Sequence, residues 1–129
     1  MKRLLAVASG LLLVGSLALA QTPVPPKRTQ LQQTEYPDGH VIIMQHLELA
    51  PGTPIARHTH PGVETSYVLE GEVELTVAGK APQTLKTGES FAVPAGTAHS
   101  AKVGAKQTKL IVTYVVDKAK PVATPAPEK

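Results

Sequence analysis

Three histidines and one glutamate have types and spacing that suit metal binding. His58 and His60 are separated by one residue, and Glu64 follows His60 by four positions. Side chains in an extended segment repeat on one face every two residues, so His58 and His60 point to the same side. His99 lies in a second block, among glycine and proline turns. Imidazoles and a carboxylate together suit iron, manganese, nickel, cobalt, copper or zinc. The sequence therefore predicts one divalent transition metal per chain.

Two ordered motifs around these residues carry a resemblance to a known family. The segment Gly52–Gly71 is similar to the first cupin motif, G-x5-H-x-H-x3-E-x6-G, at every defined position. The segment Gly88–His99 is similar to the second motif, G-x5-P-x-G-x2-H-x3-N, but Val103 replaces its final asparagine. The asparagine is usually not a ligand in the family, so the valine leaves the expected metal site intact. The resemblance covers about residues 39–116 and is typical of small single-domain exported bacterial cupins.

The resemblance implies a fold and a set of ligands. It implies an all-β single domain, a double-stranded β-helix or jelly-roll barrel, spanning residues 39–116. Inside this barrel, His58, His60, Glu64 and His99 would bind the metal. In the flavonol dioxygenase-like branch of the family, the matching glutamate also takes a proton from the substrate. Glu64 is therefore the expected catalytic residue.

Several functions are compatible with this site. The resemblance favours a quercetinase-like metal-dependent dioxygenase that acts on a small oxygenated organic molecule. A metal-dependent isomerase or lyase of a small sugar or acid would use the same four residues. A non-catalytic protein would use the barrel only to hold a metal or a small molecule. The chain has no cysteine, which excludes covalent catalysis by a thiol.

Charge and aromatic content argue against nucleic acid as a partner. The formal net charge is +3, and subtracting Lys2 and Arg3 leaves +1. The remaining lysines form no basic stripe, and the chain has three tyrosines, one phenylalanine and no tryptophan on which bases could stack. The expected partner is a small-molecule ligand or substrate.

The first twenty residues are typical of a secretory signal peptide. Lys2 and Arg3 precede an apolar run, and Ala18-Leu19-Ala20 is a small-residue cleavage site. Glycine and serine interrupt the run, which is barely long enough to span a bilayer. We therefore expect cleavage after Ala20, a periplasmic or secreted protein in a bacterium, and no membrane association of the mature chain.

The remaining pattern predicts strands and no helix. Residues 21–38 are expected to form a proline-containing N-terminal lead, and residues 117–129 a flexible proline-rich tail that could lie partly along the barrel. The strands are predicted at residues 40–49, 52–60, 64–70, 72–78, 83–86, 90–93 and 108–116. The strand at 72–78 alternates as a half-exposed strand does, whereas the strand at 108–116 is apolar on both faces and is expected to be buried on both.

The sequence also allows predictions for two further side chains and for the oligomeric state. His46 is interpreted as a core or rim histidine, and Arg57 is expected to point away from the site because it alternates with His58. The strand at 40–49 would leave a long apolar edge unpaired. Together with the resemblance, this edge predicts a homodimer.

Overall fold

The computed structural model describes residues 24–127, which form ten β-strands. The predicted signal peptide, residues 1–20, lies outside the described residues. The strands are β1 (Lys27–Tyr36), β2 (His40–Leu49), β3 (Pro54–Thr59), β4 (Gly62–Glu70), β5 (Glu72–Val77), β6 (Gln83–Lys86), β7 (Ser90–Val93), β8 (His99–Val103), β9 (Thr108–Asp117) and β10 (Thr124–Pro125). Residues 24–127 include no helix with the length and apolar character needed to cross a membrane.

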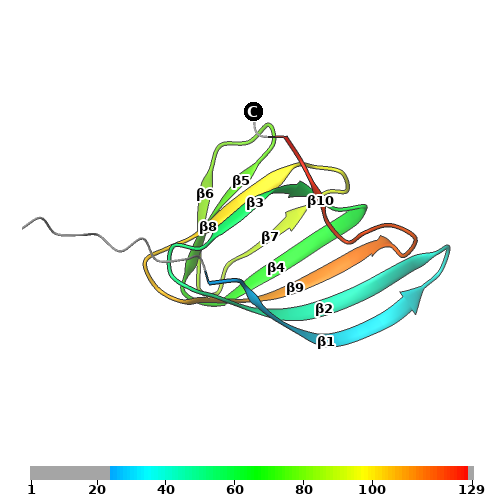
Figure 1. Ribbon diagram of the computed structural model, residues 1–129, viewed down its shortest axis with the longest axis horizontal. Coiled ribbons are helices and arrows are strands. Elements are labelled where there is room, and N and C mark those ends of the chain that lie inside the picture. The colour runs from blue at the N-terminus through cyan, green and yellow to red at the C-terminus, as the bar shows by residue number, and fades with distance from the viewer. Residues whose placement is uncertain (1–23, 128–129) are drawn as a thin grey trace, which may run out of the picture.

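The strands form two five-stranded sheets that lie as two layers (Figure 1). One sheet has the order β1-β2-β9-β4-β7, and the other has the order β10-β3-β8-β5-β6. Every pairing is antiparallel, and consecutive strands alternate between the sheets at several points. This arrangement confirms the predicted all-β, jelly-roll double-stranded β-helix and its single domain.

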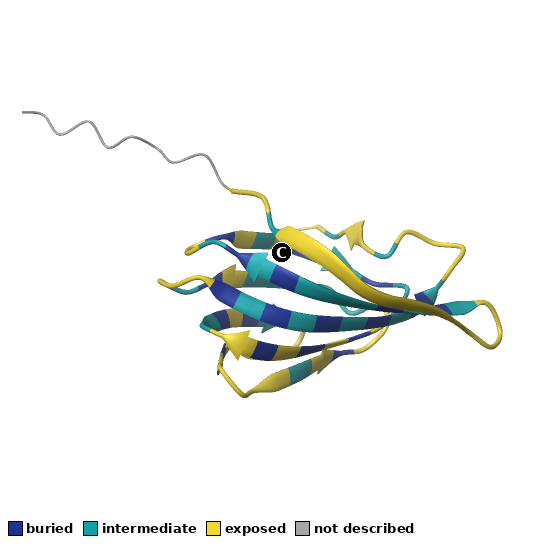
Figure 2. Cartoon of the chain, turned by 90° about the horizontal axis from the view of Figure 1, so that it is seen from below, coloured by how far each residue is buried: buried dark blue, intermediate teal, exposed yellow. Residues whose placement is uncertain are grey.

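The core is built from the inner faces of the two sheets. Val73, Leu75 and Val77 of β5 are buried, as their alternation predicts. The prediction for the strand at 108–116 was wrong on one point, because only its inner face is buried. Along β9, buried residues alternate with half-buried ones, which Figure 2 shows as bands. The outer face of β9 carries apolar side chains although no second layer of the described chain covers it.

The predicted N-terminal lead contains a strand that the sequence pattern did not indicate. All ten residues of β1 are exposed, and they include one leucine and one tyrosine among polar side chains. The strand forms because its backbone pairs along the whole of β2 (Figure 2). β2 is therefore paired on both sides, by β1 and β9, and the open edge on which we based the predicted homodimer is covered. The homodimer stays a prediction of the family resemblance, and light scattering would test it.

Two other segments complete the second sheet. β8 was not predicted as a strand, although His99, Ala101 and Val103 alternate with more polar residues. It lies at the centre of the sheet, between β3 and β5. The short strand β10 comes from the proline-rich tail and pairs with β3. Part of the tail thus lies along the barrel, beside His58 of β3.

Candidate metal centre

The structure brings the four predicted residues together. His58 lies in β3, His60 follows that strand directly, Glu64 lies in β4 and His99 begins β8. Each of the four side chains offers one potential ligand atom, and these four atoms all lie within 4.8 Å of one another. The bulged pairing of β3 with β8 places His58 opposite His99, which connects the two sequence motifs. The cluster could therefore hold a metal ion.

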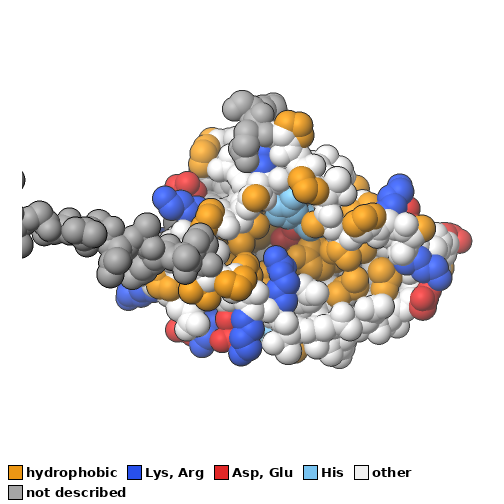
Figure 3. Space-filling view, in the orientation of Figure 1, with side chains coloured by type: hydrophobic (Ala, Val, Ile, Leu, Met, Phe, Trp, Pro, Cys, Tyr) orange, Lys and Arg blue, Asp and Glu red, His pale blue; other side chains and the backbone are white. Residues whose placement is uncertain are grey.

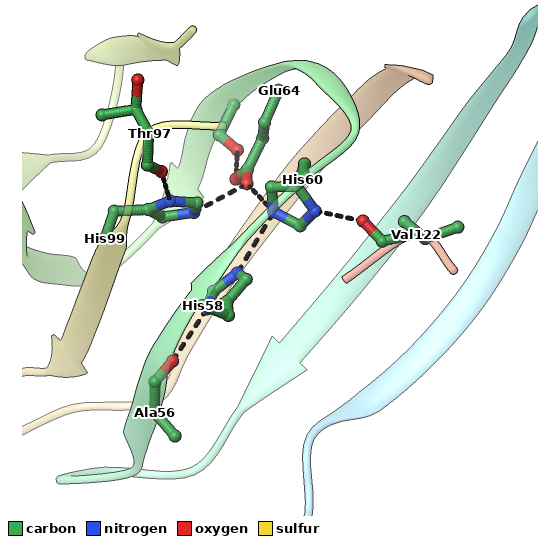
Figure 4. Close-up of polar contacts among 8 residues, drawn as sticks. Ala56, His58, His60, Glu64, Thr97, His99 and Val122 are labelled. Carbon is green, nitrogen blue, oxygen red and sulfur yellow. Dashed lines mark hydrogen bonds and ion pairs between the residues drawn. The ribbon is translucent and has the colours of Figure 1, made fainter. Parts of the chain in front are cut away.

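The imidazoles are oriented by backbone carbonyls, as Figure 4 shows. The Nδ1 atoms of His58 and His99 lie 2.7 Å and 3.0 Å from the carbonyl oxygens of Ala56 and Thr97. His60 Nδ1 lies 2.5 Å from the carbonyl oxygen of Val122 in the C-terminal tail. Because a carbonyl can only accept, each Nδ1 carries the proton. With Nδ1 protonated, loss of the Nε2 proton leaves a lone pair directed at the centre, which is the tautomer that metal ligation requires.

The Glu64 carboxylate is directed at the same point. Its Oε2 atom lies 2.7 Å from His60 Nε2 and 3.2 Å from His99 Nε2, while Ser66 Oγ donates to Oε1 at 3.0 Å. Burial raises the pKa of Glu64, but hydrogen bonds from His60 and His99 outweigh burial and lower the pKa to about 2. Glu64 is therefore a carboxylate with one oxygen in the cluster and the other held by Ser66.

The donor set fits a divalent transition metal. Ligand atoms on adjacent corners of an octahedron with metal–ligand distances of about 2.1 Å lie about 3.0 Å apart. His58 Nε2 and His60 Nε2 are 3.1 Å apart, close to this spacing. Lone pairs that face one another at such distances repel unless a proton or a cation lies between them. Burial lowers the pKa of His58, which favours the neutral imidazole that a metal ion requires. In the metal-free protein, burial lowers the pKa of His99, but its hydrogen bond to Glu64 outweighs burial and raises it.

A narrow apolar cavity leads to the centre. It has a volume of about 50 Å³ and reaches His58, Glu64 and His99, so three of the four candidate ligands face it. A water molecule needs roughly 10–15 Å³ of such a volume, so only a small part of a ligand fits beside the metal position. Figure 3 shows the hollow, with histidine and acidic side chains at its base, hydrophobic side chains around it and a basic side chain beside it. Val73, Leu75 and Phe91 line this cavity.

Three residues of the cavity and its surroundings were missed by the sequence analysis. Tyr114 of β9 lines the cavity, and its ring centroid lies 4.9 Å from that of His60. Arg28 of β1 also lines the cavity. Val122 orients His60 from the tail. None of them belongs to a motif, and only the pairing of distant strands brings them to the site.

Two expectations for nearby residues had different outcomes. His46 is half-buried on the outer face of β2, opposite Ile111, and is not part of the cluster. The expectation that Arg57 points outward was wrong, because Arg57 is only 9% exposed. The irregular pairing between Ile55 and His58 breaks the simple alternation of β3. Among the described residues, no partner reaches the buried Nε of Arg57.

The tail contact leads to a prediction about metal affinity. A chain that ends at Lys120 lacks the Val122 carbonyl that orients His60, and we expect roughly tenfold to a hundredfold weaker metal binding. The affinity is measured by competition with a chelator, and thermal unfolding checks that the shortened chain is folded. Val122→Ala is the matched control, because it keeps the backbone carbonyl and should bind metal almost normally. An equal loss in both variants would assign the effect to side-chain packing.

Comparisons with known proteins agree with the geometry. The sequence profile of the cupin domain matches residues 45–115. The fold is similar to that of an uncharacterised conserved protein with a double-stranded β-helix domain from Klebsiella pneumoniae (24% identity, 84% of this chain and 90% of that chain, TM-score 0.61). No functionally curated protein matches the sequence.

Enzymes of different classes share the fold. A DMSP lyase from Ruegeria pomeroyi is 21% identical over 66% of this chain and 43% of that chain, with a TM-score of 0.61. A salicylate 1,2-dioxygenase variant from Pseudoaminobacter salicylatoxidans, solved with gentisate, is 23% identical over 57% of this chain and 20% of that chain, with a TM-score of 0.53. At these identities the likeness shows the fold alone, so a function must be argued from the site.

Proposed function

This chain belongs to the cupin family, and on that basis we propose that it is a metal-dependent dioxygenase acting on a small oxygenated organic molecule. The observation that carries the proposal is the convergence of three Nε2 atoms and one carboxylate at the base of a narrow apolar cavity. When bound there, a redox-active divalent metal would supply the chemistry that joins dioxygen to an organic substrate.

Each residue of the centre has a distinct part in this proposal. His58, His60 and His99 would hold the metal through Nε2, because their Nδ1 atoms donate to backbone carbonyls. Glu64 would bind the metal and accept a proton from a substrate hydroxyl. Its Oε1 atom contacts Ser66 and no imidazole, which makes it the oxygen available to hold the proton. The apolar walls would exclude water from the reacting atoms.

The cavity volume bears on the substrate. A volume of about 50 Å³ favours a small hydroxylated ring or acid over a flavonol. The proposed substrate is therefore smaller than the flavonol of a quercetinase-like enzyme. Salicylate 1,2-dioxygenase, which shares the fold, is named for a small ring substrate.

A lyase or isomerase is the second candidate, and Tyr114 is the observation that favours it. Burial raises the pKa of Tyr114 to about 12, so its hydroxyl is protonated at neutral pH and can donate to a substrate oxygen. Tyr114 and Glu64 line the same cavity as a proton donor and a proton acceptor. Such a pair needs no dioxygen for its part in the chemistry. A DMSP lyase shares the fold.

Oxygen consumption distinguishes the two candidates. The protein is reconstituted separately with Fe(II), Mn(II), Ni(II) or Cu(II) and mixed with a catechol or a small hydroxylated acid. We expect it to consume one mole of oxygen for each mole of substrate converted. The uptake is followed with an oxygen electrode, and the product by mass spectrometry with labelled oxygen. Substrate conversion that proceeds equally without oxygen would replace the dioxygenase by the lyase or isomerase. Metal binding with no conversion under either condition would favour a binding protein.

A further inference from the structure

Arg28 gives the cavity a positive charge away from the metal ligands. It is the one arginine or lysine among the residues that line the cavity. The register explains its direction, because Arg28 pairs with Leu47, a buried residue that lines the same cavity. The guanidinium also lies close enough to Tyr114 to lower the pKa of its hydroxyl, although burial outweighs this effect and raises that pKa overall. Arg28 thus extends from β1 over the inner face of the sheet toward Tyr114.

The charge of Arg28 has no opposite charge beside it among the described residues. Among residues 24–127, no carboxylate lies within ion-pair distance of Arg28. The neighbouring Lys27 differs, because its Nζ lies 2.6 Å from Glu48 Oε1. Glu64 is the only carboxylate that lines the cavity, and its oxygens are already held by His60, His99 and Ser66. An arginine that has no carboxylate partner in the described chain and lies at an apolar cavity is suited to a ligand anion.

We propose that Arg28 recognises a carboxylate on the ligand, so that the substrate class is a small, largely apolar carboxylic acid with a second oxygen that reaches the metal position. This inference rests on the proposed metal-dependent function of the same cavity. A divalent ion held by neutral imidazoles and one carboxylate retains a positive charge. The cavity therefore presents positive charge at its base and at Arg28, with apolar walls between them. A guanidinium offers two parallel N–H groups that match a carboxylate.

Binding of simple hydroxy acids tests this assignment without any turnover. The probes are glycolate, lactate and 3-hydroxybutyrate, each compared with its neutral amide by isothermal titration calorimetry on Mn(II)-loaded protein. We expect at least one acid to bind about tenfold more tightly than its amide. Arg28→Gln should remove that difference by weakening the acid, while the affinity for the amide and the metal content stay unchanged.

Lys27→Gln is the matched control. This variant also removes one positive charge from β1, but Lys27 forms an ion pair with Glu48 and does not line the cavity. The proposal is overturned if no acid binds the wild type better than its amide, if Arg28→Gln keeps the preference, or if Lys27→Gln reduces it equally. Metal content is measured first by plasma emission. A protein without bound metal contradicts the proposed function, and the Arg28 comparison is then made on the metal-free protein, so the two failures are distinguishable.

Discussion

His60→Ala is expected to lose nearly all bound metal. His60 is 4% exposed, and its Nε2 atom lies 3.1 Å from His58 Nε2 and 2.7 Å from Glu64 Oε2, so it occupies the middle of the cluster. Loss of a residue that only supports a ligand weakens metal binding about tenfold to a hundredfold, and loss of a ligand itself should exceed that range. Metal content after dialysis, measured by plasma emission on wild type and variant, is the test.

His46→Ala is the control for this experiment. It also removes one imidazole, but from the outer face of β2, where His46 pairs with Ile111 and contacts none of the cluster. Its metal content should equal that of the wild type. Equal metal content in the wild type and both variants would place the metal elsewhere. A parallel loss in both variants would indicate nonspecific binding to histidines, and circular dichroism would confirm that each variant is folded.

The sequence was sufficient to predict which four residues lie together, because two ordered motifs mark them and the spacing within the first motif reflects local geometry. His58 and His60 share a face through the period of an extended chain, and Glu64 follows across one turn. The strands at 40–49 and 83–86 were predicted with the bounds that β2 and β6 have. Their apolar alternation and flanking turns depend only on neighbours in sequence.

The parts that could not be predicted depend on pairing between distant segments. The residues of β1 are all exposed, so its sequence shows no apolar alternation. β1 forms a strand because its backbone pairs with that of β2. The direction of Arg57 follows from the irregular pairing of β3 with β8, which no local period contains. For the same reason, the tail contact of Val122 and the cavity position of Arg28 were missed. The three candidate ligands of the first motif are thus close in sequence, whereas His99 and the residues around the site reach it only through contacts between distant segments.

The variant Glu64→Gln separates the two roles proposed for Glu64, which are metal binding and proton acceptance. Glutamine keeps the shape of the side chain, one oxygen for the metal and a partner for Ser66, but it removes the negative charge and the basic oxygen. We expect weakened metal binding that excess metal restores. At equal metal occupancy, turnover should fall by about 10²–10⁴, the usual contribution of a positioned base. Oxygen uptake with the best substrate of the wild type, divided by measured metal content, gives this comparison.

Ser66→Ala provides the control that makes the Glu64 result specific. It removes the hydrogen bond to Oε1 at 3.0 Å but keeps the carboxylate and its charge. Its turnover should therefore fall less than that of Glu64→Gln at the same metal occupancy. Wild-type turnover in metal-loaded Glu64→Gln would restrict Glu64 to holding the metal. Unchanged metal affinity with lost turnover would instead make Glu64 a base that does not bind the ion. Because metal content and rate are measured on the same sample, each result assigns one role to one property of the carboxylate.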